Sequence, residues 1–218
     1  MAFFDVDETL VSVRTLESFL LYYRGLVPSM ISQDDLRALA AKVVQLDRAE
    51  FNRLYFSIWG GQPAERVREA GRTWYAEASA HPDFYRANVL QRLREHQDAG
   101  DHVVLVSGSF AAPLEPLAAD LGVERLYCTE LEVLDGRFTG EISQAMIGDD
   151  KSRVVEEYLA SADEATSSWG YGDHSSDLSL LERVGNPVVV GSDPVMLEVA
   201  AERDWPVMPI EQPLAPRS

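Results

Sequence analysis

Short apolar runs alternate with helix-like segments in the second half of the chain, and this alternation limits the possible folds more than any other feature. The run Val103–Val106, inside a strand predicted at His102–Ser107, is continuously apolar, as expected of a central parallel strand. Strands alternating with helices predict an α/β fold with a mainly parallel sheet. Further strands are expected at Arg125–Thr129, Thr166–Tyr171 and Pro187–Val190. One helix is expected between the strand His102–Ser107 and about Leu121. Further helices are expected at Val89–Gln97, Lys151–Ala160, Asp177–Val184 and Pro194–Glu202.

A long helical segment interrupts this alternation directly after the first predicted strand, Ala2–Val6. Residues 15–84 have the spacing of amphipathic helices almost throughout. Ser32 followed by Asp35 resembles a capping box ahead of an apolar set that includes Val43 and Val44. We therefore expect an α/β core formed by residues 1–14 and 85–218, and an inserted all-helical cap formed by residues 15–84.

Two further segments are predicted from their turn residues. Leu131–Ile142 contains an Asp135-Gly136 pair between two runs, which is typical of a β-hairpin. The tail from Trp205 contains four prolines, so we expect it to be extended or frayed.

The composition limits the partners and the setting. The chain has 218 residues and a formal net charge of −17, which argues against nucleic acid or an anionic membrane as a partner. It has one cysteine, Cys128, so it cannot form an internal disulfide. The sequence shows neither a signal peptide nor an apolar run long enough to span a membrane, and we expect a cytoplasmic location.

Polar residues follow two of the predicted strands, at the edge where parallel sheets bind ligands. Asp5 and Asp7 follow the first strand, and the turn beyond it can bring both carboxylates to one site. Ser107-Gly108-Ser109 follows the apolar run Val103–Val106 and precedes a helix, which is a favourable place for an anion. Each motif alone is also compatible with a solvated acidic turn or with ordinary loop and cap residues.

Two more polar motifs lie further along the chain. Lys151 lies at the start of a predicted helix, in a chain with only one other lysine, Lys42. Lys151 is therefore either an ordinary surface residue or a residue whose ammonium group the site requires. Asp173 and Asp177 lie four residues apart across a turn into a helix. Two such carboxylates can share Mg²⁺, although a helix cap with a first-turn acid would give the same pattern.

In combination, the four motifs closely resemble those of the haloacid-dehalogenase-like (HAD) superfamily, in the family order and over essentially the whole chain. The helical cap, the Ser-Gly-Ser form of the second motif and the hairpin before the lysine resemble the phosphoserine-phosphatase-like branch. The resemblance implies a Rossmann-like core. The residues that carry it are Asp5, Asp7 and Thr9 of an Asp-x-Asp-x-Thr motif, Ser107, Lys151, and Gly172, Asp173 and Asp177 of a Gly-Asp-x-x-x-Asp motif.

The resemblance implies a Mg²⁺-dependent phosphatase that acts on a small phosphate ester through an aspartyl-phosphate. Asp5 would be the nucleophile, and Asp7 the general acid and then the base. Lys151 would neutralise charge on the phosphate and on Asp5. The implied metal ligands are Asp5, the backbone carbonyl of Asp7, Asp173 and Asp177, and the implied phosphate-binding residues are Thr9, Ser107 and Gly108.

One position departs from the pattern of the branch. Phosphoserine phosphatases have a glutamate nine residues beyond the nucleophile that helps to bind the substrate amino group, whereas this chain has Arg14. A cation cannot hold an ammonium group, so we predict a substrate other than L-phosphoserine. Arg14 is either a ligand for a second anionic or hydroxyl-rich group of the substrate or a surface residue near the hinge.

Two other functions remain open from the sequence. The first is a phosphotransferase or phosphomutase of the same family, which would keep Asp7. The second is a non-catalytic phospho-ligand-binding regulator, although such a protein would usually have lost Asp5, Asp7 or Lys151.

Overall fold

The computed structural model describes residues 1–42, 45–159 and 162–210. Within these residues, seven strands form one sheet in the order β4-β3-β2-β1-β5-β6-β7. All neighbouring strands are parallel except β3 and β4, so the predicted α/β fold with a mainly parallel sheet is confirmed. The strands are β1 (Ala2–Phe4), β2 (Val103–Phe110), β3 (Arg125–Leu134), β4 (Arg137–Gln144), β5 (Trp169–Gly172), β6 (Asn186–Val190) and β7 (Val207–Met208).

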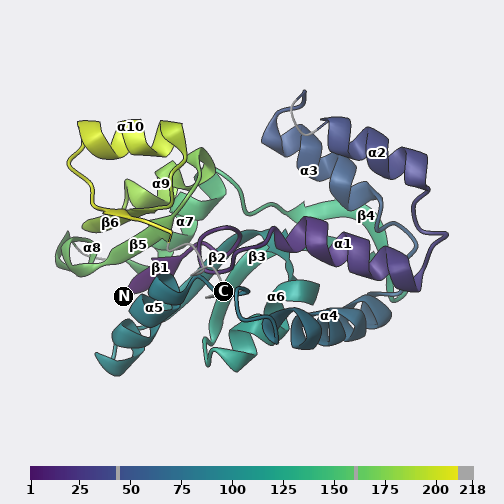
Figure 1. Cartoon of the computed structure of the whole chain (residues 1–218), viewed down its shortest axis with the longest axis horizontal. Helices are drawn as coiled ribbons and strands as arrows, with labels where there is room; N and C mark the ends of the chain where they lie inside the picture. Colours follow the sequence, from purple (N-terminus) through teal and green to yellow (C-terminus); the bar gives the residue numbers. More distant parts are fainter. Residues whose placement is uncertain (43–44, 160–161, 211–218) are drawn as a thin grey trace, which may run out of the picture.

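Helices cover both faces of the sheet (Figure 1). Neighbouring strand residues alternate between two hydrophobic clusters: Phe4 and Leu105 belong to one, and Phe3 and Val104 to the other. The first cluster includes side chains of α5 (Ala87–Asp98) and α6 (Ala111–Asp120). The second includes side chains of α7 (Asp149–Tyr158), α9 (Leu178–Leu181) and α10 (Pro194–Glu202). This two-sided burial explains why the run Val103–Val106 in β2 is continuously apolar.

The segment between β1 and α5 is helical, as predicted, and consists of α1 (Thr15–Leu26), α2 (Gln33–Lys42), α3 (Arg48–Ser57) and α4 (Ala64–Ser79). Its entry and exit lie side by side, because Ser12 N–H donates to the Phe84 carbonyl at 2.8 Å and Arg86 N–H donates to the Leu10 carbonyl at 2.9 Å. This pairing is what an insert requires. The exact division at residues 15–84 stays a prediction. Val43 and Val44 of the predicted apolar set lie outside the described residues.

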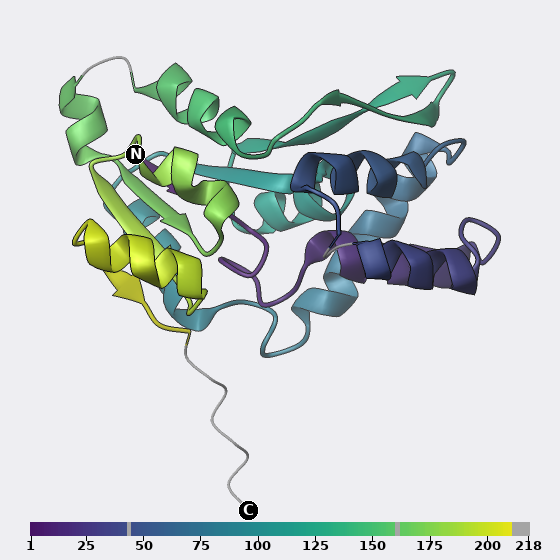
Figure 2. The ribbon, with the colours of Figure 1, turned by 90° about the horizontal axis from the view of Figure 1, so that it is seen from above.

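The helical segment packs directly on the α/β part of the chain. Gly71 of α4 lies so close to α6 that a Cβ atom at this position would be 1.9 Å from the Ala112 carbonyl oxygen. The β3–β4 hairpin extends alongside the helices (Figure 2), and Ala64 N–H donates to the Gly136 carbonyl at 2.9 Å. The helical segment is therefore held by close backbone contacts on two sides.

The predicted hairpin is confirmed, and its turn has the expected geometry. Asp135 and Gly136 both have positive φ, at 48° and 74°, as a type I′ turn requires. The described part of the tail is extended, and β7 pairs with β6 at the edge of the sheet instead of fraying. The remainder of the tail, residues 211–218, lies outside the described residues.

The predicted strand at Thr166–Tyr171 is partly wrong. Residues Ala162–Ser167 form α8, and the strand β5 begins at Trp169. Asp163 and Glu164 lie in the first turn of this helix, where negative charge is favoured. Gly185 packs against the Thr166 backbone, where a Cβ atom would be 2.1 Å from the carbonyl oxygen. Ala160, the end of the predicted helix Lys151–Ala160, lies outside the described residues.

None of the helices within the described residues combines the length and the apolar character that a membrane span requires.

Candidate active site

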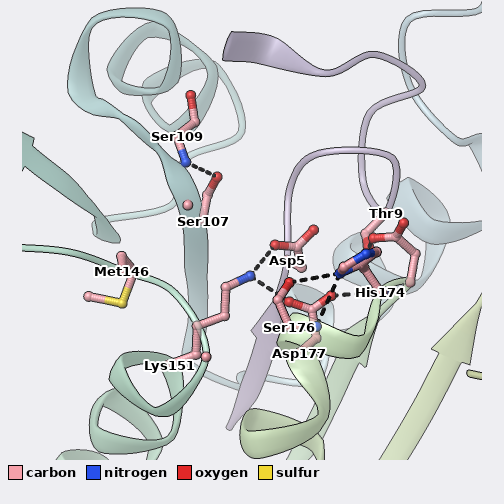
Figure 3. Close-up of polar contacts among 12 residues, drawn as sticks. Asp5, Thr9, Ser107, Ser109, Met146, Lys151, His174, Ser176 and Asp177 are labelled. Carbon is pink, nitrogen blue, oxygen red and sulfur yellow. Dashed lines mark hydrogen bonds and ion pairs between the residues drawn. The ribbon is translucent and has the colours of Figure 1, made fainter. Parts of the chain in front are cut away.

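The predicted site residues gather at the carboxyl-terminal edge of the sheet, around the end of β1 (Figure 3). Asp5 follows β1, and its N–H donates to the Tyr171 carbonyl of the neighbouring β5 at 3.0 Å. Asp173 follows β5 directly, and Lys151 lies in the first turn of α7. Parallel strands therefore bring together residues that are up to 172 positions apart, as the sequence predicted.

Lys151 links two carboxylates in the interior of the protein. Its Nζ atom donates to Asp5 Oδ1 at 2.5 Å and to Asp177 Oδ1 at 2.6 Å. All three side chains are almost completely buried, with Lys151 2%, Asp5 5% and Asp177 1% exposed. Because buried charges are costly unless they are paired, these two contacts make Lys151 essential to the arrangement.

The carboxylates nevertheless carry more negative charge than Lys151 offsets. Burial and the nearby Asp177 carboxylate raise the pKa of Asp5 well above its usual range, although Lys151 acts in the opposite direction. The same two causes raise the pKa of Asp173 to about 7. Burial lowers the pKa of Lys151, but Asp177 and Asp5 outweigh it, so this pKa lies above its ordinary value. The group thus favours an additional positive charge.

Two local contacts hold Asp173 and Asp177 of the Gly-Asp-x-x-x-Asp motif in place. Thr9 Oγ1 donates to Asp173 Oδ1 at 2.7 Å, so the buried Thr9 contacts the acidic group and does not line the cavity described below. Gly172 allows Asp177 to pack against β5, because a Cβ atom at Gly172 would be 2.6 Å from the Asp177 Cβ atom. The predicted contact between Thr9 and phosphate stays a prediction.

Asp7 is positioned by the beginning of the helical segment. Thr15 N–H donates to Asp7 Oδ1 at 2.8 Å, and Thr15 Oγ1 donates to Ser109 Oγ at 2.8 Å. The first residue of α1 therefore connects the first motif to the second. Thr15 was not among the predicted site residues, because the helical pattern of α1 does not indicate that its first residue lies beside Asp7.

The second motif precedes a helix, as predicted, because α6 begins at Ala111, but the strand before it ends three residues later than predicted. β2 continues to Phe110, and its pairing with β3 shifts between Ser107 and Phe110. Ser107 Oγ accepts from Ser109 N–H at 3.1 Å, and the Gly108 carbonyl accepts from Thr129 Oγ1 at 3.0 Å. Irregular pairing at a strand end can redirect residues toward a site, and Gly108 does line the cavity beside Asp5.

Three of the four predicted metal ligands lie together. Oxygen atoms of Asp5, Asp173 and Asp177 all lie within 4.8 Å of one another. Three carboxylates with one lysine leave two negative charges, and carboxylate oxygens are the ligands that Mg²⁺ prefers, so the residues fit a divalent cation. Asp7 is not part of this group of side chains, and the predicted role of its backbone carbonyl stays a prediction.

A cavity of about 750 Å³ adjoins these acids and extends between α1, α2 and α3. Asp5, Asp7, Gly108, Asp173 and Asp177 form its acidic end. Of the cap aromatics, which we expected to be mostly core with one or two in the substrate pocket, Phe51 and Tyr55 line this cavity.

Arg14 also lines the cavity, but it is not a free cation. Its Nε atom donates to Glu8 Oε2 at 2.6 Å, and both side chains are well exposed. The Glu8 hydrogen bond, outweighing partial burial, raises the pKa of Arg14. Glu8 was not a predicted partner of Arg14, although it lies only six residues away in the sequence.

Comparisons with known proteins agree with this geometry. The family model of the haloacid dehalogenase-like hydrolases matches residues 2–182. A Streptomyces azureus protein named for the inhibition of morphological differentiation is 30% identical over 98% of this chain and 79% of its own length. A histidinol-phosphatase of Neisseria meningitidis is 27% identical over 95% of this chain and 97% of its own length.

A solved structure has the same fold. A phosphoserine phosphatase, captured as an analogue of its phospho-aspartyl intermediate, aligns with a TM-score of 0.67 at 17% identity, over 97% of this chain and 93% of that chain. Its identity is too low to transfer a substrate, but the shared fold agrees with the resemblance that the motifs imply. The chain belongs to the haloacid dehalogenase-like hydrolase family and is a phosphatase of its phosphoserine-phosphatase-like branch.

Proposed function

We propose that the protein is a Mg²⁺-dependent phosphomonoester hydrolase that transfers the phosphoryl group of a small metabolite to Asp5 and then to water. The observation that carries the proposal is the contact between the buried Asp5 carboxylate and Lys151 at 2.5 Å, at the acidic end of a cavity. A carboxylate in this environment can act as a nucleophile once a cation reduces the surrounding negative charge.

Asp5 and Lys151 have different roles in the transfer of the phosphoryl group. Asp5 attacks phosphorus, its new bond replaces the bond to the leaving oxygen, and water later attacks the aspartyl-phosphate to release inorganic phosphate. Lys151 holds Asp5 in place and stabilises negative charge that develops on the transferred group. Catalysis of phosphoryl transfer depends mainly on such positioning and charge stabilisation.

Asp7 is the proposed general acid and base. Its carboxylate lines the cavity, and the Thr15 N–H bond at 2.8 Å holds one oxygen, which restricts the side chain. Asp7 would give a proton to the leaving alcohol oxygen in the first step. The resulting carboxylate would then accept a proton from the attacking water, so that the acid is regenerated.

Mg²⁺ would be held by Asp5, Asp173 and Asp177, with the Asp7 backbone carbonyl as a further proposed ligand. Bound there, it would supply positive charge that the protein lacks at this point. Thr9 supports the arrangement by its bond to Asp173 at 2.7 Å. We assign phosphate binding to Ser107 and the Gly108 N–H group, whereas contacts of Thr9 and Arg14 with the substrate stay predictions. A cytoplasmic location and the absence of nucleic-acid and membrane partners stay predictions.

The proposal is tested with Asp5→Asn, which keeps the shape of the side chain but removes its nucleophilic charge. We expect a loss of at least about 10³-fold in kcat on an aryl phosphate. The matched control is Glu124→Gln, an exposed acid far along the sequence, which should leave kcat unchanged. Retained turnover in Asp5→Asn would exclude Asp5 as the nucleophile.

Two further measurements complete the test. EDTA should abolish turnover, and added Mg²⁺ should restore it. Brief incubation of the wild type with ³²P-labelled substrate, followed by acid quenching, should label the protein at Asp5. Product analysis with an added alcohol acceptor separates hydrolysis from phosphotransfer, because a transferase would pass the label to the alcohol.

A further inference from the structure

The cavity beside Asp5 has mainly apolar walls away from its acidic end. Its volume of about 750 Å³ lies within the range of about 300–1,000 Å³ that is usual for sites that enclose a whole small ligand. A phosphoryl group would occupy only the acidic end. The apolar side chains that line the remainder come from α1, α2, α3 and the loop before α3 and are Leu16, Leu20, Leu21, Leu36, Leu39, Ala40, Leu46, Phe51 and Tyr55.

Two arginines that line this cavity are each paired with an acid. Arg14 bonds to Glu8 at 2.6 Å, and Arg37 bonds to Asp34 at 3.0 Å. Glu17 lines the cavity as well but is exposed to solvent. The walls thus have few unpaired charges to bind a small leaving group such as serine, which carries an ammonium and a carboxylate group. Their apolar side chains favour an apolar leaving group instead.

One buried polar side chain interrupts the apolar wall. Asn52 on α3 is only 5% exposed, and it lines the cavity. Across the part of the chain that the structure describes, its side-chain amide has no hydrogen-bond partner. Tyr55, one turn further along, differs, because its hydroxyl donates to the Leu16 carbonyl at 2.6 Å. Asn52 therefore offers both a donor and an acceptor to a bound molecule.

We propose that the leaving group of the substrate is a large apolar alcohol that carries one uncharged hydrogen-bonding group, which Asn52 recognises. The apolar walls supply most of the binding free energy, because removing apolar surface from water is favourable in proportion to its area. Asn52 supplies selectivity, because an unpaired buried amide penalises a ligand that cannot bond to it. This inference rests on the proposed phosphatase function and names its substrate class.

The first test measures kcat/KM for unbranched alkyl phosphates of increasing length. Each methylene that enters the cavity should raise kcat/KM by up to about fourfold until the cavity is filled. Leu21→Asn should reduce this dependence on chain length, because Leu21 lines the cavity at 49% exposure. Leu26→Asn is the matched control, since Leu26 lies on the same helix at 51% exposure but does not line the cavity.

The second test compares chains of one length that end in a methyl, hydroxyl, ammonium or carboxylate group. Asn52→Leu should raise kcat/KM for the methyl-ended ester relative to the hydroxyl-ended ester by about two- to tenfold. A preference of the wild type for the ammonium or carboxylate ester would overturn the uncharged class. An equal methyl-to-hydroxyl ratio in both proteins would overturn the role of Asn52.

Failure of this inference is distinguishable from failure of the proposed function. A flat series of alkyl phosphates, with turnover intact, would overturn the apolar leaving group alone. If no monoester were hydrolysed, calorimetric binding of alkyl phosphonates in the presence of Mg²⁺ would still test the cavity. Affinity that rises with chain length in the wild type, and rises less in Leu21→Asn, would support the inference, and affinity independent of chain length would contradict it.

Discussion

The acidic end of the cavity and the interior of the helical segment are both buried, but the first consists of ionisable side chains and the second of aromatic side chains. At the acidic end, Asp5, Asp177 and Lys151 are ionisable side chains that are at most 5% exposed. In the helical segment, Phe19 stacks on Trp59 with ring centroids 5.4 Å apart and an interplanar angle of 8°. The aromatic cluster carries no charge, whereas the acidic group has more negative charge than Lys151 offsets.

The same contrast is visible in the distribution of charge. Residues 15–84 contain 8 basic and 9 acidic residues, whereas the remainder contains 11 basic and 27 acidic residues. The acidity of the chain therefore belongs to the part that contains the proposed metal site. A strongly acidic protein can still bind an anionic ester, provided that a bound cation reverses the local field. In the proposed function, the α/β part supplies the catalytic residues, while the helical segment supplies an apolar surface that would select the substrate.

The largest expected effect comes from removing the lysine between the two carboxylates. Lys151→Met leaves Asp5 and Asp177 buried without their partner, so the metal-free protein should lose about 3–5 kcal/mol of unfolding free energy. Turnover should fall by at least about 10³-fold, because the charge on the transferred group is no longer stabilised. Urea unfolding in EDTA and steady-state kinetics measure the two effects.

The matched control for this variant is the only other lysine. Lys42→Met changes an exposed residue of α2 and should leave both quantities unchanged. If Lys151→Met were as stable as the wild type in EDTA, the carboxyl groups of Asp5 and Asp177 would be protonated and uncharged in the metal-free protein. The contrast between a charged and an apolar interior would then be wrong.

The next largest effect tests how firmly the two regions are joined. Gly71→Ala places a methyl group 1.9 Å from the Ala112 carbonyl oxygen and should separate α4 from α6, with a loss of about 1–3 kcal/mol in stability. Gly25→Ala is the control, because no atom lies within 4 Å of its added Cβ atom and alanine favours the helix by up to about 1 kcal/mol. Thermal unfolding measures both. A neutral Gly71→Ala would show that the helical segment is not seated on α6.

A smaller effect of opposite sign is expected for the acidic group. Asp173→Asn removes one of the three neighbouring negative charges but keeps an acceptor for Thr9, so the protein in EDTA should gain about 1–2 kcal/mol of stability. Activity should be lost, because a proposed metal ligand is lost. Adding Mg²⁺ should stabilise the wild type and not the variant. If Mg²⁺ stabilised both equally, Asp173 would not be a ligand.

The sequence predicts correctly those parts of the molecule in which the local residue pattern agrees with the burial of the side chains. The apolar run in β2, the Asp135-Gly136 turn and the helix Pro194–Glu202 all have local signals that the structure confirms. Three of the four motifs lie at the ends of strands, which meet at one edge of a parallel sheet, whereas Lys151 opens a helix. The contact between Asp5 and Lys151 was predicted from the family resemblance, because Lys151 lies on a helix and not on a strand.

The remainder depends on contacts in the folded chain that the pattern of apolar and polar residues does not contain. The start of β5 was misplaced because α8 is stabilised by the close approach of Gly185 to Thr166. Asn52 looked like any polar residue of an amphipathic helix, and only the packing of α1, α2 and α3 turns it toward the cavity. Arg14 was interpreted from its charge alone, without its partner Glu8.

The smallest expected effect concerns this pair, which lies where the two regions join. An exposed ion pair contributes at most about 1 kcal/mol, so Arg14→Gln should change stability little and should lower kcat/KM by no more than about fivefold. Glu8→Gln should change kcat/KM by a similar factor in the opposite direction, because it frees the Arg14 cation for the substrate. Arg14→Glu should then be more harmful than Arg14→Gln, since it adds a second like charge beside Glu8. A loss of a hundredfold or more in Arg14→Gln would mean that substrate binding breaks the pair and recruits Arg14 directly. In that case selectivity would reside in the α/β part of the chain as well as in the helices.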